Sequence, residues 1–248
     1  MSLIEWVEKG DTERVRECIH QGVDVNARDG AWWTALMRAC YVKNDMELGK
    51  LLLDSGADVN AGNYSGNTSL SIASSHGSAN FVKLLLENGA NLEAANYFGW
   101  TALMEAAMCG NIHSLKVLLE NGADVEKSDD IGKKPLMHAV NFSVAELLLE
   151  YGVDVDAKDN LGRTALMFAT RAEKSGIVKL LLENGADVEA KDEFNRTAFN
   201  HVICAEQSTT MKVLEDEIER RKHLKMARYT FLRHTNFHLA QEIALRLN

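Results

Sequence analysis

The chain repeats itself along its length, and this repetition constrains its fold more than any other feature. The octet WTALMRAC at 33–40 returns with substitutions at 67–74, 100–107, 133–140, 163–170 and 196–203. A block such as KLLLENGADVEA follows each of the first five octets, and the glycine within it recurs about every 33 residues. A unit of this length is too thin to bury an apolar core alone, so successive units must stack into a solenoid.

Each unit has the pattern of two short helices followed by an extended polar loop. A threonine precedes the first apolar run in most units, where its hydroxyl can accept a hydrogen bond from a free N–H at a helix start. These threonines are Thr34, Thr68, Thr101, Thr164 and Thr197. Gly77 and Gly110 suit the turn between the helices, and Gly89 and Gly122 suit the left-handed position after the second helix. The pattern predicts an all-α fold.

The octet GRTALMFA at 162–169, followed by VKLLLENGADVEAKD at 178–192, resembles the ankyrin-repeat family. The resemblance covers roughly 2–203 and implies an ankyrin-repeat solenoid of stacked helix-turn-helix units with projecting hairpin loops. We expect about six to seven repeats, including caps. The family's usual Thr-Pro-Leu-His is Thr-Ala-Leu-Met here, and only Pro135 keeps the proline. The methionines would replace the lost histidines by packing.

The repeat register divides the chain into a repeat domain at 1–203 and a C-terminal helical cap or extension at 204–248. Within the domain we expect an N-terminal cap at 1–28, full repeats, and a degenerate last repeat from 192. The full repeats span 29–62, 63–95, 96–128, 129–158 and 159–191.

Two of these repeats are irregular in sequence. The repeat at 129–158 lacks three residues between its helices and has Lys134 in place of the capping threonine. This predicts either a tolerated deletion or a local change of curvature. In the repeat at 159–191, Glu173 takes the place of the glycine between the helices, which predicts a reshaped turn.

Composition argues for a globular protein outside the membrane. The chain has 46% hydrophobic and 25% charged residues and a formal net charge of −9. It has no run of eighteen apolar residues, and its first residues lack the pattern of a signal peptide. Its cysteines, Cys18, Cys40, Cys109 and Cys204, are too far apart for paired metal ligands, which favours free thiols in a reducing compartment. We expect a cytoplasmic monomer, or a protein of a host cytosol if the chain is a secreted effector.

No motif for catalysis stands out in the sequence. We find no Gly-rich phosphate loop, nucleophile elbow or His-Glu-x-x-His pair. The acidic residues of the GADVEAKD loops recur with the repeat, and we interpret them as solvated turn residues that satisfy backbone donors. We therefore expect a non-enzymatic protein with no catalytic residue, metal site or cofactor.

Large aromatic residues occupy loop positions that are polar in other units. In the ankyrin family the hairpin tips and the exposed side of the first helix form a concave surface that binds partners. Carried onto this chain, the resemblance implies partner-binding residues at Trp33, Arg38, Tyr41, Tyr64, Tyr97, Trp100, Glu105 and Met108. Equivalent positions in later repeats carry the secondary candidates Lys133, Arg163 and Arg196.

The aromatic residues could instead fold back and pack between neighbouring hairpins. One hairpin position is apolar in most repeats, which favours a structural role there. Its residues are Phe98, Ile131, Leu161 and Phe194.

Two functions fit these patterns. The favoured one is an interaction scaffold or adaptor that binds a partner protein on the hairpin-tip and first-helix surface. The alternative is a regulatory module that binds nucleic acid or an acidic protein through basic helices at 217–248, a segment of net charge +4. We favour a capping role for this tail, because the rest of the chain is acidic and repels phosphate. Its apolar stripe would be Phe237, Ala240, Ile243, Ala244 and Leu247.

Overall fold

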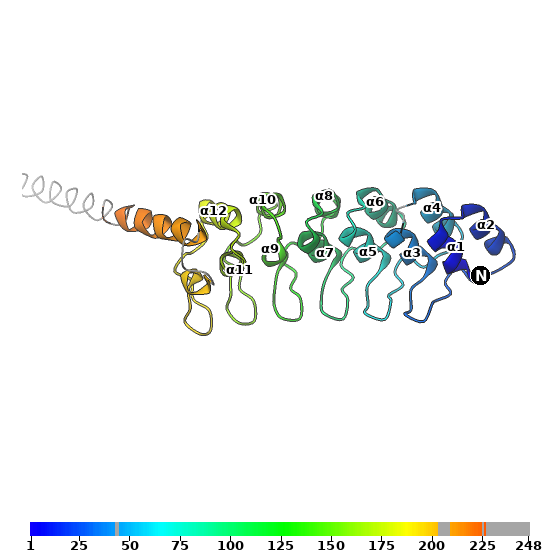
Figure 1. Ribbon diagram of the computed structural model, residues 1–248, viewed down its shortest axis with the longest axis horizontal. Helices are drawn as coiled ribbons and strands as arrows, with labels where there is room; N and C mark the ends of the chain where they lie inside the picture. Colours follow the sequence, from blue (N-terminus) through cyan, green and yellow to red (C-terminus); the bar gives the residue numbers. More distant parts are fainter. Residues whose placement is uncertain (43–44, 203–208, 225, 227–248) are drawn as a thin grey trace, which may run out of the picture. The chain divides into compact units, whose positions relative to one another are not determined.

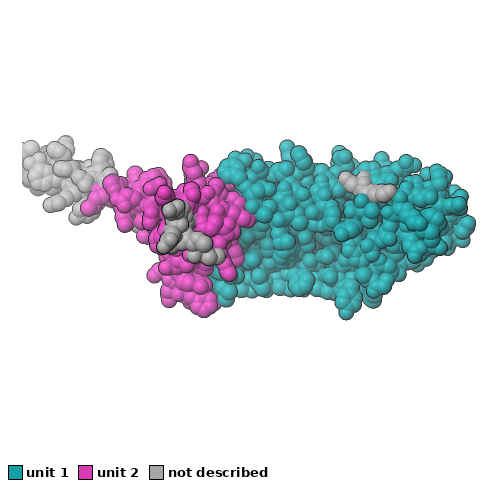
Figure 2. All heavy atoms as spheres, viewed as in Figure 1, with its two compact units in different colours: residues 1–165 teal, residues 166–248 magenta. Residues whose placement is uncertain are grey.

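The structure is a computed structural model that describes residues 1–42, 45–202, 209–224 and 226. The chain forms two compact units, residues 1–165 and 166–248 (Figure 2). Within the described ranges the regular structure is helical, and β-pairing is limited to isolated bridges at the bases of hairpin loops.

Unit 1 is a stack of helix pairs whose hairpin loops project on the side of the first helices (Figure 1). The first helices α3, α5, α7 and α9 each contact the next, as do the second helices α4, α6, α8 and α10. The helices of this unit are α1 (Leu3–Lys9), α2 (Thr12–His20), α3 (Ala35–Val42), α4 (Met46–Asp54), α5 (Ser69–Ser75), α6 (Ala79–Glu87), α7 (Ala102–Cys109), α8 (Ile112–Glu120), α9 (Pro135–His138) and α10 (Phe142–Glu150). This arrangement confirms the predicted solenoid of helix-turn-helix units.

The core of unit 1 is built from the same positions of successive repeats. Each first helix buries the leucine of its octet, and each second helix buries a central leucine. These are Leu36, Leu70, Leu103 and Leu136, with Leu52, Leu85, Leu118 and Leu148. Met37 and Met104 beside them are wholly buried, which confirms their predicted packing role. Each such side chain contributes roughly 1.5–3 kcal/mol by burial, so stability accumulates along the stack.

Most of the predicted helix caps are present. The hydroxyl of the threonine accepts the N–H three residues on, at 3.3–3.4 Å, in three repeats. These are Thr34, Thr68 and Thr101. The prediction is wrong for Thr164, whose hydroxyl is buried without a hydrogen-bond partner. Thr197 does lie at the N-cap position, before the 3₁₀ helix at Ala198–His201, and its N–H and hydroxyl both donate to Asn200 Oδ1.

Left-handed residues connect the two helices of a repeat, as predicted. Gly77 and Gly110 have φ of 75° and 76°. Glu173 has φ of 53°, so the turn in its repeat keeps the same left-handed conformation and the predicted reshaping is wrong. A non-glycine residue has a small steric penalty in this conformation.

The repeat at 129–158 is irregular in the way its missing residues predict. Its first helix, α9, is a single turn of four residues that begins at Pro135. Lys134 makes no capping bond, and its Nζ lies 2.6 Å from Glu126 Oε2. Asn141 Oδ1 accepts the Val144 N–H and starts α10 directly. The deletion therefore shortens the first helix and leaves the second intact.

In unit 2, α11 (Ala165–Arg171) continues from the unit boundary and is followed by α12 (Ser175–Glu183). After a hairpin loop come a short 3₁₀ helix, η1 (Ala198–His201), and a helix over 209–224. Leu214 of this last helix is wholly buried, and Arg221 donates to the Ala186 carbonyl at 2.9 Å. The helix thus contacts the loop that follows α12. The apolar stripe predicted at 237–247 lies outside the described residues.

Candidate functional site

An aspartate or asparagine at the base of each hairpin loop holds the loop in shape. Its Oδ1 accepts the N–H groups two and four residues on, at 2.8–3.0 Å in every repeat. These residues are Asp29, Asn63, Asn96, Asp129, Asp159 and Asp192. An amide oxygen and a carboxylate oxygen accept equally well, so both residue types fit the position.

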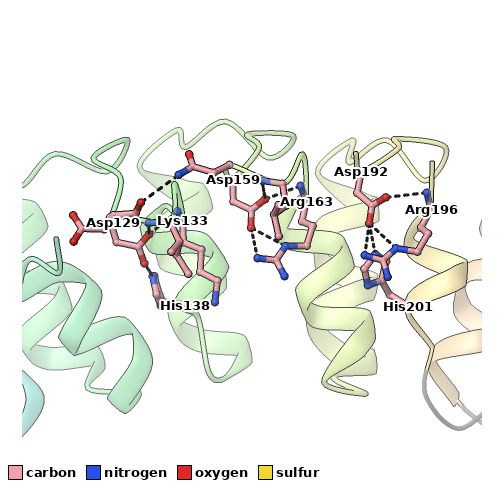
Figure 3. Close-up of polar contacts among 12 residues, drawn as sticks. Asp129, Lys133, His138, Asp159, Arg163, Asp192, Arg196 and His201 are labelled. Atoms are coloured by element: carbon pink, nitrogen blue, oxygen red, sulfur yellow. Dashed lines mark hydrogen bonds and ion pairs between the residues drawn. The ribbon is translucent and has the colours of Figure 1, made fainter. Parts of the chain in front are cut away.

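Where the base residue is an aspartate, its second oxygen pairs with a basic side chain (Figure 3). Asp129 Oδ2 lies 3.1 Å from His138 Nε2, and Asp159 Oδ2 lies 2.6 Å from the Arg163 guanidinium. Asp192, with Arg196 and His201, follows the same rule in unit 2. Since these three aspartates are buried and paired, the interpretation of the loop acids as solvated turn residues is wrong for them.

Burial and hydrogen bonding shift the pKa values of Asp192 and His138. Burial alone raises the pKa of Asp192, but hydrogen bonds from the Arg196 N–H and guanidinium, and then from the Phe194 N–H and His201, lower it to about 2. Burial lowers the pKa of His138, and the Asp129 carboxylate opposes part of that shift. A neutral imidazole therefore occupies the site beside Asp129 at neutral pH.

In the repeat at 29–62, the tryptophan belongs to a cluster of contacting side chains, which we call the Trp33 cluster. The Arg38 guanidinium lies 4.6 Å from the Trp33 ring centroid and 2.6 Å from Asp29 Oδ2. Arg38 Nε also lies 3.3 Å from Glu8 Oε1. The Tyr41 ring meets Trp33 edge-on at 5.4 Å between centroids. The predicted site residues Trp33, Arg38 and Tyr41 are therefore brought together, and they contact each other.

In the repeat at 96–128, the equivalent tryptophan lines a groove, which we call the Trp100 groove. Its volume is about 560 Å³. The predicted residues Trp100, Glu105 and Met108 meet here. The remaining lining residues are Ser65, Asn67, Asn96, Phe98, Asp129, Asp130 and Ile131. The groove thus runs over three successive hairpins and the exposed side of α7.

Glu105 is the charged residue that distinguishes this groove from the Trp33 cluster. It stands nine residues after Asn96, where Arg38 follows Asp29 and His138 follows Asp129. The carboxylate is half-buried and makes no hydrogen bond or ion pair with any described residue. Burial raises its pKa, which the charge of His76 opposes in part. The groove therefore holds an acidic group at the position where the repeats at 29–62 and 129–158 carry a basic residue.

Comparison with known proteins identifies the repeat. A family model described as ankyrin repeats in three copies matches residues 3–96, 91–159 and 141–225. The chain belongs to the ankyrin-repeat family. This membership confirms the resemblance and the fold that it implied.

Two solved ankyrin domains resemble the chain, each at 28% identity. The ankyrin repeat domain of Bcl-3, described as a unique member of the IkappaB protein family, has a TM-score of 0.73 and covers 87% of this chain and 98% of its own. The human ASB11 ankyrin repeat domain has a TM-score of 0.77 and covers 88% of this chain and 97% of its own. No curated protein matches the chain significantly.

The other predicted site residues lie apart from the Trp100 groove. Tyr64, 74% exposed, lines a hollow of about 430 Å³ together with Trp33. Tyr97 is 72% exposed at an ankyrin hairpin tip and lines neither cavity. Among the secondary candidates, Arg163 and Arg196 pair with the base aspartates of their own hairpins, and the Lys133 N–H donates to Asp129.

Two groove residues were misread from the sequence. Phe98 and Ile131 share a position that we interpreted as packing between hairpins, yet they are 66% and 52% exposed. Leu161 and Phe194 at the same position are also exposed, so that interpretation is wrong. In unit 1 backbone bonds join these hairpins instead, since the Asp130 N–H donates to the Phe98 carbonyl. The side chains are free to line a surface.

Trp32 is an exposed aromatic residue that the sequence reasoning missed. It has φ of 64° and occupies the position where later ankyrin repeats carry Gly66, Gly99, Gly132 and Gly162. Its ring lies 5.0 Å from the Arg28 guanidinium. A bulky residue in the glycine position of the repeat register was the signal that could have revealed it.

The described part of the chain contains neither a candidate metal cluster nor a candidate membrane-spanning helix. No group of three or more His, Cys, Asp or Glu side chains there could hold a metal ion. None of the helices in those ranges is both long and apolar enough to span a bilayer.

Proposed function

We propose that this ankyrin-repeat chain is a non-enzymatic scaffold or adaptor that binds a segment of a partner protein in the Trp100 groove. Ankyrin-repeat domains are in general protein–protein interaction modules. The observation that carries the proposal is the groove itself, where Phe98, Met108 and Ile131 are exposed around the half-buried Trp100. Contiguous exposed apolar surface marks interaction sites, and tryptophan is among the commonest interface hot spots.

The described part of the C-terminal tail does not favour the alternative function. Arg220 and Arg221 of helix 209–224 both pair with Glu217, at 2.7 Å and 2.6 Å. The single Glu217 carboxylate thus offsets one of the two positive charges within the helix, which weakens a phosphate-binding role. The rest of the basic tail lies outside the described residues. We therefore propose a protein partner. The cytoplasmic location and monomeric state stay predictions.

The test begins with selection of peptides from a random display library on the immobilised full chain. The affinity of the best peptide is then measured by calorimetry for the wild type and for Trp100→Ala/Met108→Ala. We expect the double variant to bind at least about tenfold more weakly, since a hot-spot truncation costs about 2 kcal/mol.

The matched control is Tyr151→Ala, which removes an exposed aromatic ring at the end of α10. Circular dichroism establishes that all variants fold. Equal affinity of the double variant and the control would refute the proposed site.

A further inference from the structure

We propose that the partner segment presents an arginine to the Trp100 groove, with its guanidinium against the Trp100 ring and paired with Glu105, next to an apolar residue that contacts Phe98 and Ile131. The inference rests on the proposed function and specifies the chemistry of the partner. Three observations lead to it.

The first observation is a template inside the same chain. In the Trp33 cluster a guanidinium lies over the tryptophan ring at 4.6 Å and is held by a carboxylate at 2.6 Å. The Trp100 groove has the same tryptophan, but its repeat replaces Arg38 with Glu105 and Asp29 with Asn96. The ring and a carboxylate remain, and the guanidinium is absent.

The second observation is the charge of the lining. The ionisable side chains that line the groove are Glu105, Asp129 and Asp130, all acidic. Asp129 is already paired with His138. His76 lowers the pKa of Glu105 through its charge, and its Nδ1 lies 2.9 Å from the Ile72 carbonyl and 3.0 Å from Ser75 Oγ. An anionic ligand would be repelled, and a cationic one would be attracted.

The third observation is the shape of the available contacts. A flat aromatic ring beside a carboxylate suits a guanidinium, which stacks and pairs at the same time. An ammonium group pairs as a point charge and stacks less well. Arginine is therefore the preferred residue, and the apolar rims at Phe98 and Ile131 suit an aliphatic or aromatic neighbour.

The experiment repeats the peptide selection on the wild type and on Glu105→Gln, which keeps the side-chain shape and removes the charge. We expect wild-type peptides enriched in arginine beside an apolar residue, and loss of that enrichment on Glu105→Gln. In the best wild-type peptide, arginine is then replaced by citrulline, which is neutral and nearly isosteric, and by lysine. We expect citrulline to weaken binding about tenfold or more and lysine to weaken it less.

The outcomes separate this inference from the proposed function. If the peptides lose affinity on Trp100→Ala/Met108→Ala but lack a basic residue, or tolerate citrulline, the arginine inference is wrong and the groove stands as a binding site. If they are acidic, the inference is also wrong. If no peptide is enriched, or affinity survives the double variant, the proposed function itself fails. The citrulline comparison leaves the protein unchanged, so misfolding of a variant cannot decide it.

Discussion

The repeats at 29–62 and 96–128 place the same tryptophan at the same position and surround it differently. Trp33 is covered by Arg38, which Asp29 and Glu8 hold in place. Trp100 has Glu105 in place of the arginine and lines a groove of about 560 Å³, whereas the hollow beside Trp33 has a volume of about 430 Å³. The difference teaches that an aromatic residue in a hairpin is not by itself a binding signal. Two residues decide whether the tryptophan ring packs against an arginine of its own chain. One lies at the base of the hairpin, and the other lies nine residues later.

The scaffold permits this exchange because the loop does not depend on it. Asp29 and Asn96 accept the same two backbone N–H groups through Oδ1. Only the second polar atom of the side chain differs. Asp29 Oδ2 pairs with Arg38, whereas Asn96 Nδ2 donates to Asn67 Oδ1 at 2.9 Å. Surface chemistry can therefore change between repeats without loss of the hairpin.

The largest expected effect is a difference in stability between the alanine variants of the two tryptophans. Trp33→Ala should lower the free energy of unfolding by about 3 kcal/mol, because it removes the ring that Arg38 and Tyr41 contact. Trp100→Ala should cost about half as much, since that ring lines the groove and meets His138 edge-on, at 4.7 Å between centroids. Urea denaturation measures both. Equal losses of unfolding free energy in the two variants would contradict the distinction between Trp33 and Trp100.

The second prediction concerns two substitutions that give the repeat at 96–128 the aspartate–arginine pair of the repeat at 29–62. Asn96→Asp should destabilise the chain by about 1.5 kcal/mol, because the new carboxylate would lie close to the carboxylate of Glu105 and repel it. The same spacing of nine residues brings Asp29 into contact with Arg38. Asn96→Asp/Glu105→Arg should restore stability by forming the missing pair. The same variant should lose affinity for the groove peptide. Failure of the second substitution to rescue the first would contradict the equivalence of the two repeats.

The third prediction concerns the hairpin tips. Trp32→Gly should stabilise the chain by about 0.7 kcal/mol, because it relieves a left-handed tryptophan at φ of 64°. Gly99→Ala, at the equivalent position, should destabilise it, since a Cβ there would lie 2.7 Å from the Asp130 nitrogen. Thermal unfolding of the two variants should shift in opposite directions. A shift of Trp32→Gly to lower temperature would show that the tryptophan is held by favourable contacts.

The smallest effect is a difference in acid sensitivity. Burial raises the pKa of Asp29, but hydrogen bonds from Arg38 and the backbone outweigh it and leave the pKa below 3.8. The stability that this carboxylate contributes is complete above its unfolded pKa and is lost as the pH falls through its folded pKa. Asp29→Asn should therefore flatten the decline of unfolding free energy below about pH 4 by a few tenths of a kcal/mol. Asp130→Asn controls for the loss of one carboxylate, and an equal flattening there would exclude the Arg38 pair as the cause.

The fold could be predicted from the sequence because its determinants are local and repeated. The period, the octet leucines and the turn glycines each specify one unit, and stacking follows from the thinness of that unit. The site could be predicted only in part. Trp33 and Trp100 look alike in the repeat register, and the contact that distinguishes them joins Asp29 to Arg38, nine residues away. Phe98 and Ile131 were misread because an apolar position that recurs was taken to be buried.

The central claim is that Trp33 stabilises the chain and Trp100 binds the partner. The most direct measurement is the affinity of one groove-selected peptide for Trp33→Ala and Trp100→Ala, by calorimetry at a temperature where both variants are folded. The account predicts wild-type affinity for Trp33→Ala and a loss of at least about tenfold for Trp100→Ala. A loss of affinity in Trp33→Ala as large as that in Trp100→Ala, or unchanged affinity in Trp100→Ala, would contradict it.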